Sequence, residues 1–90
     1  MAIRRTIKLS PSQRRVLEQN RDHHPEAYVR ERCSAILKIS EGQAPYAVAQ
    51  RGLLKSRDPD AVYQWLTLYE AEGLAGLIAH RQGGNHRRSL

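Results

Sequence analysis

The spacing of apolar side chains along the chain predicts an all-α domain of about four helices. The clearest stripe falls within residues 59–72, where four large apolar residues recur at i, i+3, i+4 and i+7 and so share one side of a helix. These residues are Val62, Trp65, Leu66 and Tyr69. A second stripe, within residues 25–40, consists of Val29, Cys33, Ile36 and Leu37. A first helix over residues 11–21 is predicted to bury Val16 and Leu17.

Polar and helix-breaking residues mark where these helices begin and end. Ser10 and Gln13 form a capping-box pattern around a first-turn proline. Asp58 followed by Pro59 is another strong helix start, because the carboxylate accepts from free amides and the proline ring fixes φ. Gly73 is expected to end the last helix in a left-handed conformation.

Residues 43–72 combine a short helix of small apolar residues, over 45–51, with a turn and the longer helix. This arrangement is typical of a helix-turn-helix, in which the second helix enters the DNA major groove. Gly52, in the turn, is expected to take a backbone conformation that is costly for other residues. Ala49 and Val62 are thirteen positions apart. In a helix-turn-helix with a turn of three to four residues the corresponding separation is about ten, so the turn here carries about three extra residues. The sequence therefore predicts an extended turn.

The positive charge of the chain is unevenly distributed. The formal net charge is +6 and the isoelectric point is about 10.1, which points to a polyanionic partner such as nucleic acid. Residues 1–21 carry a net charge of +5 and residues 80–90 carry +3. Residues 58–79, in contrast, hold four acids and no base. The acidic charge argues against base recognition along the whole length of the longer helix.

Three segments resemble the N-terminal helix-turn-helix domain of mariner-type bacterial insertion-sequence transposases. They are Tyr28–Gly42, Asp60–Leu66 and Tyr69–Leu77. The resemblance extends from about Ser10 to Leu77, and its most specific part is Val-Tyr-x-Trp-Leu followed by Glu-Gly-Leu-x-Gly-Leu. In that family this domain binds the terminal inverted repeats, and a separate downstream domain carries the metal-binding carboxylates. Because the sequence ends at Leu90, the resemblance implies the DNA-binding half only.

We expect the DNA contacts to lie on the exposed side of the longer helix, in the preceding turn and on the basic segments. Gln64 is the strongest candidate for base recognition, since its amide can both donate to and accept from adenine. Cations at the start of the helix are expected to bind phosphates, and the free backbone amides of the helix N-terminus are expected to bind them too. The alternative is that these cations belong to a solvated loop without a DNA contact. The full set of predicted DNA-binding residues is Lys55, Ser56, Arg57, Tyr63, Gln64, Thr67, Arg4, Arg5, Arg30 and Arg32.

Several of these residues have an equally simple structural interpretation. Arg30 and Arg32 could bind the DNA backbone, but helical arginines often form a solvated surface, and Glu31 offers them a local partner. Tyr63 could donate to a phosphate or simply lie on the surface. In the tail, Arg81 and Gly84 stand where the transposase family often has an Arg-Pro-Gly-Arg minor-groove segment. The missing proline and second arginine there favour a disordered tail instead.

The sequence predicts neither an enzyme nor a metal or cofactor site. The four histidines and Cys33 include no Cys-x-x-Cys motif and no His pair at i, i+4. The acids of residues 58–72 lie at the two ends of one helix, and no nucleophile has an evident base, so no small-molecule substrate is expected. The chain also lacks a membrane-spanning apolar run and a secretory signal. Cys33 is the only cysteine, and its place within an apolar helix indicates a buried thiol in a reducing cytoplasm.

The predicted organisation is a flexible basic arm over residues 1–9, a homeodomain-like or winged-helix-like domain over residues 10–79 and a polar basic tail over residues 80–90. The predicted function is binding of double-stranded DNA by a stand-alone or truncated transposase-type domain in the prokaryotic nucleoid. Homodimerisation stays open at this point. The targets considered are terminal inverted repeats or a regulatory site.

The alternative is a helical protein-interaction module without specific DNA recognition. It is favoured by the acidic helix and by a candidate apolar dimer surface formed by Leu53, Leu54 and Leu68. The two functions differ in their response to salt. DNA binding predicts a steep salt dependence, whereas the interaction module predicts a stable oligomer that is indifferent to DNA.

Overall fold

The computed structural model describes residues 6–53 and 57–79, and within these ranges the chain is helical and contains no strand. The elements are α1 (Pro11–His23), α2 (Ala27–Ser40), α3 (Pro45–Ala47), the π-helix η1 (Val48–Gly52), α4 (Pro59–Glu72) and α5 (Leu74–Ala79). The predicted all-α class is confirmed. The apolar pattern did not predict α5 as a separate helix.

The helix ends follow the capping residues of the sequence. Ser10 Oγ accepts from the Gln13 amide at 3.1 Å, and Gln13 Oε1 accepts from the Ser10 amide at 2.9 Å, so the predicted capping box is present. Asp58 caps α4 by accepting from the Asp60 amide at 2.9 Å. Gly73 ends α4 with a φ of +69°, as expected, although its ψ of −153° lies outside the left-handed helical region.

The core lies where α2 and α4 meet the other elements. Both predicted stripes are buried, and small residues of η1 let this element pack closely against α2 and α4. The large buried apolar residues are Leu17, Val29, Ile36, Leu37, Ile39, Val48, Val62, Trp65, Leu66, Tyr69 and Leu77. Val16 was expected in the core but is 43% exposed, because α1 turns only one side, that of Leu17, toward α2.

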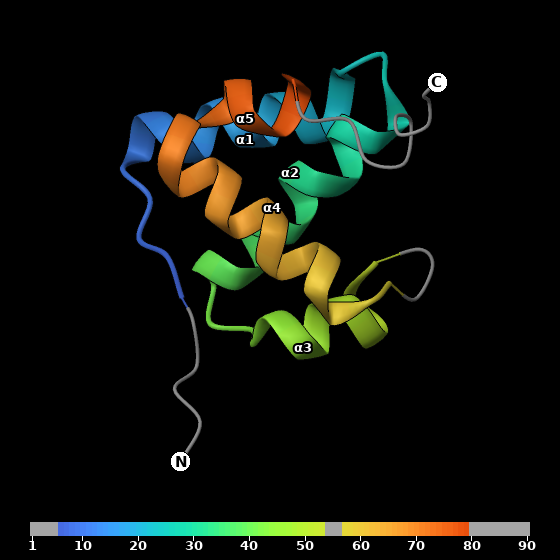
Figure 1. Cartoon of the computed structure of the whole chain (residues 1–90). Helices are drawn as coiled ribbons and strands as arrows, with labels where there is room; N and C mark the ends of the chain where they lie inside the picture. Colours follow the sequence, from blue (N-terminus) through green and yellow to red (C-terminus); the bar gives the residue numbers. More distant parts are fainter. Residues whose placement is uncertain (1–5, 54–56, 80–90) are drawn as a thin grey trace.

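Figure 1 shows how the elements are arranged around α4. Helices α1 and α5 lie at one end of the molecule and α3 lies at the other, with α2 and α4 between them. Helix α1 packs on α2, while α4 contacts α2, α3, η1 and α5. The short α3–η1 segment and α4 therefore form a helix-turn-helix pair that α2 supports.

The turn between η1 and α4 is extended, as the sequence predicted. Residues 53–58 separate the two helices, and the Arg57 amide donates to the Ala49 carbonyl at 2.7 Å, which closes the turn. The expectation for Gly52 was wrong. Among the described glycines only Gly42 and Gly73 have a positive φ, so Gly52 takes a backbone conformation that other residues also adopt.

Candidate nucleic-acid interface

The exposed side of α4 carries polar residues at helical spacing. Asp60, Gln64 and Thr67 are exposed and recur at i, i+4 and i+7, so they form one row, and Tyr63 is half-buried beside them. The buried stripe of α4 packs against the core and fixes the orientation of this row. The Gln64 amide makes no hydrogen bond to another described residue and is therefore available to a ligand. This is the orientation that the sequence predicted for Gln64.

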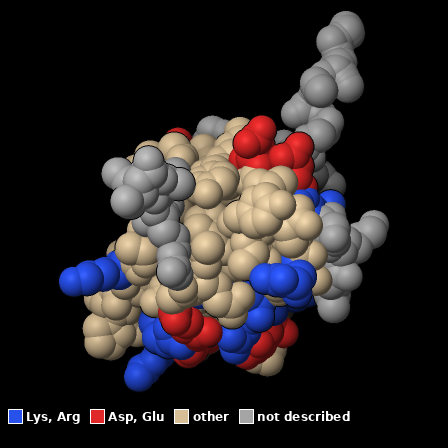
Figure 2. All heavy atoms as spheres, turned by 90° about the horizontal axis from the view of Figure 1, so that it is seen from below, with Lys and Arg blue, Asp and Glu red and all other residues tan. Residues whose placement is uncertain are grey.

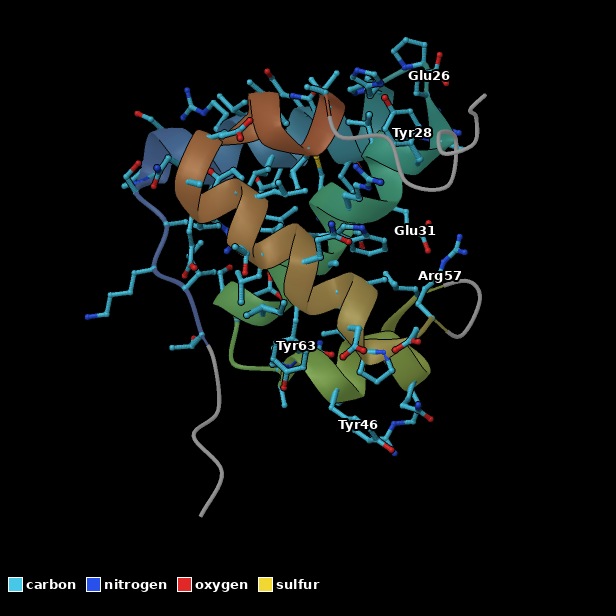
Figure 3. The ribbon with its side chains drawn as sticks, viewed as in Figure 1. Glu26, Tyr28, Glu31, Tyr46, Arg57 and Tyr63 are labelled. Carbon is cyan, nitrogen blue, oxygen red and sulfur yellow. The ribbon has the colours of Figure 1, made fainter. Side chains whose placement is uncertain are left out.

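An exposed tyrosine on α3 lies at the same end of the molecule as Tyr63 of α4. Tyr46 is 59% exposed, although it belongs to a segment of otherwise small and apolar residues. Figure 3 shows Tyr46 and Tyr63 together at the lower end of the domain. Tyr46 was not among the predicted site residues. Its signal was a large aromatic residue with a polar hydroxyl among the small residues of the segment 44–49.

Arg57 is held by Glu31 of α2 rather than extended into solvent. Its Nε lies 2.6 Å from Glu31 Oε2 and its Nη2 lies 2.8 Å from Glu31 Oε1, so the two side chains form a two-point ion pair. The hydrogen bond to the Glu31 carboxylate raises the pKa of Arg57, although burial opposes it. The turn before α4 is thus connected to α2 by a side-chain pair as well as by the Arg57 amide.

Arg32 is a structural residue, and its predicted role in DNA binding was wrong. It is only 2% exposed, and its Nη1 donates to the Leu77 carbonyl at 2.8 Å. The guanidinium lies 5.0 Å from the ring centroid of Tyr28 and 5.5 Å from that of Trp65, and burial lowers its pKa. A phosphate cannot reach it there. The sequence did hold the signal, since Arg32 follows Val29 by three positions on the buried stripe of α2.

Of the remaining predicted DNA-binding residues, one lies on α2 and the others lie outside the described ranges. Arg30 is half-buried on α2 and donates to the His24 carbonyl. The others, Arg4, Arg5, Lys55 and Ser56, lie outside the described residues, as do Leu54 of the candidate dimer surface and the tail over residues 80–90. Of that dimer surface, Leu53 packs against the core and is half-buried.

The surface around α3 is mainly uncharged. Figure 2 views the domain from below and shows a largely uncharged face, with Lys and Arg side chains toward its edges and acidic groups among them. At the start of α4, Asp58 uses its carboxylate as the helix cap. A duplex approaching this face would therefore meet mainly neutral polar and aromatic side chains, with Asp60 as the exposed acid of the row on α4.

One comparison with known proteins agrees with this geometry. The family model described as winged helix-turn-helix matches residues 32–90, more than half of the chain, and the chain belongs to this family. The matched region begins within α2 and includes α3, η1, α4 and α5. Searches of curated proteins and of solved structures found no match. The chain therefore contains a winged helix-turn-helix domain, a class of domain that typically binds DNA.

Within residues 6–53 and 57–79 there is no group of three or more His, Cys, Asp or Glu side chains that could hold a metal ion. In the same part of the chain, none of the helices combines the length and apolar character needed to cross a membrane.

Proposed function

We propose that this domain binds double-stranded DNA by placing the start and middle of α4 in the major groove. The observation that carries the proposal is the row on α4, in which Gln64 and Thr67 are exposed on a helix held by the core of a winged helix-turn-helix domain. Gln64 is assigned to base recognition, with adenine as the expected base. Tyr63 and Tyr46 flank it as contacts to sugar or phosphate.

The basic segments supply the electrostatic part of this interaction. Arg4, Arg5, Lys55 and Ser56 are assigned to phosphate contacts, in line with the net charge of +6. Arg57 is assigned a positioning role, because its two-point pair with Glu31 sets where the turn delivers α4. Asp58 does not oppose the DNA strongly, since its carboxylate accepts from the Asp60 amide.

The target class follows from the resemblance to mariner-type transposases. We propose that the domain is of transposase type and that its site is the terminal inverted repeat of an insertion sequence or a regulatory site of similar sequence. Support comes from the resemblance over Tyr28–Gly42, Asp60–Leu66 and Tyr69–Leu77. Inverted repeats present the same site at both ends of an element, so one domain per end is sufficient for recognition.

The experiment is selection of a preferred duplex from a random pool, followed by titration of variants against that duplex and a scrambled control. Gln64→Ala is expected to lose roughly 1–3 kcal/mol of binding free energy on the selected duplex and little on the scrambled one. Gln19→Ala, which removes an exposed glutamine from α1, is the matched control and should bind like the parent.

Two results would contradict the proposal. Equal losses for Gln64→Ala on both duplexes would remove Gln64 as the base-recognising residue. Recovery of no enriched sequence, together with a binding constant that does not respond to salt, would contradict DNA binding itself. If about four to six phosphates are contacted, log K should fall against log salt with a slope of about −4 to −5.

A further inference from the structure

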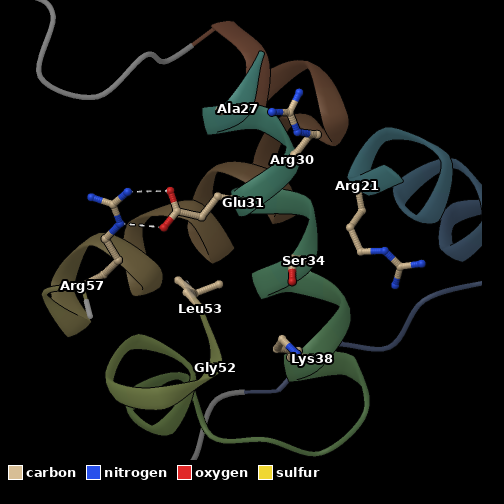
Figure 4. A pocket seen from close by; sticks show the side chains of 9 residues that line it. All are labelled: Arg21, Ala27, Arg30, Glu31, Ser34, Lys38, Gly52, Leu53 and Arg57. Carbon is tan, nitrogen blue, oxygen red and sulfur yellow. Dashed lines mark hydrogen bonds and ion pairs between the residues drawn. The ribbon is translucent and has the colours of Figure 1, made fainter. Parts of the chain in front are cut away.

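A groove of about 600 Å³ runs over the outward side of α2. Figure 4 shows α2 as its floor, Arg21 of α1 on one side and the turn with Arg57 on the other. The groove is separate from the surface assigned above to base recognition. In Figure 3, Glu31 and Arg57 lie at the side of the molecule, whereas Tyr46 and Tyr63 lie at its lower end.

Hydrogen-bond donors form a straight row along the floor of this groove. Arg30, Ser34 and Lys38 recur at i, i+4 and i+8 of α2, and Figure 4 shows them one below the other. At about 1.5 Å per residue the row is ~12 Å long. Over that length each strand of B-DNA carries about three phosphates or more, at about 3.4 Å of helix axis per phosphate. The short Ser34 side chain in the middle leaves room for a backbone to approach α2.

The charges of this groove are only partly compensated within the described chain. Glu31 is the one acid among its lining residues, and both of its oxygens accept from Arg57. Arg21 is paired with Asp22 at 2.9 Å. Arg30 donates to a neutral carbonyl, which leaves its charge uncompensated, and the Lys38 ammonium makes no ion pair with a described residue. Arg30 and Lys38 are both half-buried, so an anion between them would be screened less than on an open surface.

We propose that the row of Arg30, Ser34 and Lys38 binds the phosphodiester backbone of the DNA that flanks the site recognised by α4. This inference rests on the proposed function, because α4 must first hold the duplex. Because the groove lies to the side of Tyr46 and Tyr63, it is reached by the duplex beyond the footprint of α4 and not by the bases within it. The row adds affinity to the complex without adding base specificity.

The test compares two duplexes that share the selected site. One is a hairpin-closed duplex of about one and a half turns (~15 base pairs), which covers the α4 footprint, and the other extends to about three turns (~30 base pairs). The variants are Arg30→Gln, Lys38→Gln and the double variant. Arg15→Gln removes an exposed cation of α1 that is not part of the groove and is the matched control.

On the long duplex the double variant is expected to reduce the steepness of the salt dependence by about two, and each single variant by about one. On the short duplex the variants, the control and the parent protein should bind alike, while Gln64→Ala weakens binding to both. Lys38→Gln removes the ammonium and keeps the first two methylenes of the side chain, so it is a measurement of charge even if Arg30→Gln lowers the melting temperature.

Other outcomes overturn the inference. Unchanged binding of both single variants to the long duplex would exclude a backbone contact at this groove and leave an acidic protein segment as its occupant. Equal losses on the two lengths would place the row inside the α4 footprint, contrary to the proposal. If the parent protein binds neither duplex, the proposed function fails first and this inference fails with it.

Discussion

Arg57, in the turn, and Glu31, on α2, form a two-point ion pair that joins the turn to the supporting helix. The pair acts together with the hydrogen bond from the Arg57 amide to Ala49, so a turn of six residues is fixed at its end next to α4. In an extended helix-turn-helix this connection decides where the start of α4 lies. The geometry is specific to arginine, since a lysine ammonium cannot make the same planar two-point contact.

The first prediction uses that specificity. Arg57→Lys keeps the charge but removes the two-point contact, and Glu31→Gln removes the carboxylate. Both are expected to weaken binding to the selected duplex by a few-fold, up to about 1 kcal/mol for a half-exposed pair, with an unchanged salt slope. If Arg57 instead binds phosphate directly, Glu31→Gln will strengthen binding, and Arg57→Ala will lower the slope by about one.

The second prediction concerns Trp65, which is 2% exposed on the buried stripe of α4. Trp65→Ala is expected to cost roughly 3–5 kcal/mol, which is enough to unfold most of so small a domain. The measurement is thermal melting followed by circular dichroism. Tyr46→Ala, at an exposed aromatic residue, is the control and should melt within a few degrees of the parent. A Trp65 variant that melts like the parent would contradict the assigned orientation of α4.

The third prediction separates a structural arginine from a DNA-binding one. Arg32→Ala removes a buried side chain that lies over Tyr28 and Trp65 and leaves the Leu77 carbonyl without its donor. We expect a loss of roughly 2–4 kcal/mol of unfolding free energy, and a smaller loss for Arg32→Met, which keeps the packed stem. Arg15→Ala, at an exposed arginine, should be nearly neutral in the same denaturant titration. A neutral Arg32→Ala would contradict the structural role.

The fourth prediction is a reversal of the usual effect of alanine in a helix. Replacing glycine by alanine within a helix normally stabilises it by about 0.5–1 kcal/mol. At Gly76 a Cβ would lie 2.6 Å from the Leu68 carbonyl oxygen, because α5 packs directly on the end of α4. Gly76→Ala is therefore expected to destabilise the domain by roughly 1–3 kcal/mol. Ala75→Ser, at the exposed neighbouring position, is the control for the melting experiment.

The fifth prediction is a loss of stability in alkaline solution. Burial raises the pKa of the Cys33 thiol from 9.0 to about 11. Below pH 9 the thiol is protonated in both states, but between about pH 9 and 11 only the unfolded state ionises, so unfolding becomes easier as the pH rises. The contribution is expected to reach about 1–2 kcal/mol near pH 10.5. Burial also raises the pKa of Tyr69. Comparison with Cys33→Ala isolates the part due to Cys33, and equal pH profiles would contradict it.

The sequence by itself determined the helices other than α5, their ends and most of the core. These features depend on interactions between residues close together in the chain, such as the capping box of Ser10 and Gln13 and the cap that Asp58 makes for the amide of Asp60. The i, i+3, i+4 spacing also identified the buried side of α4, and with it the exposure of Gln64. Local chemistry and helical periodicity are sufficient for such conclusions, because each involves positions less than two turns apart.

The tertiary structure alone decided what the arginines do. Arg32 and Arg57 have the same charge, yet one lies against the rings of Tyr28 and Trp65 in the core and the other is paired with Glu31 across the turn. Their partners, Leu77 and Glu31, are 45 and 26 positions away in the sequence. A long, flexible cationic side chain can extend into solvent, pack in the core or pair with a distant carboxylate. The local sequence does not favour one of these environments over the others. Only the packing of α2 against α4, α5 and the turn selects among these environments.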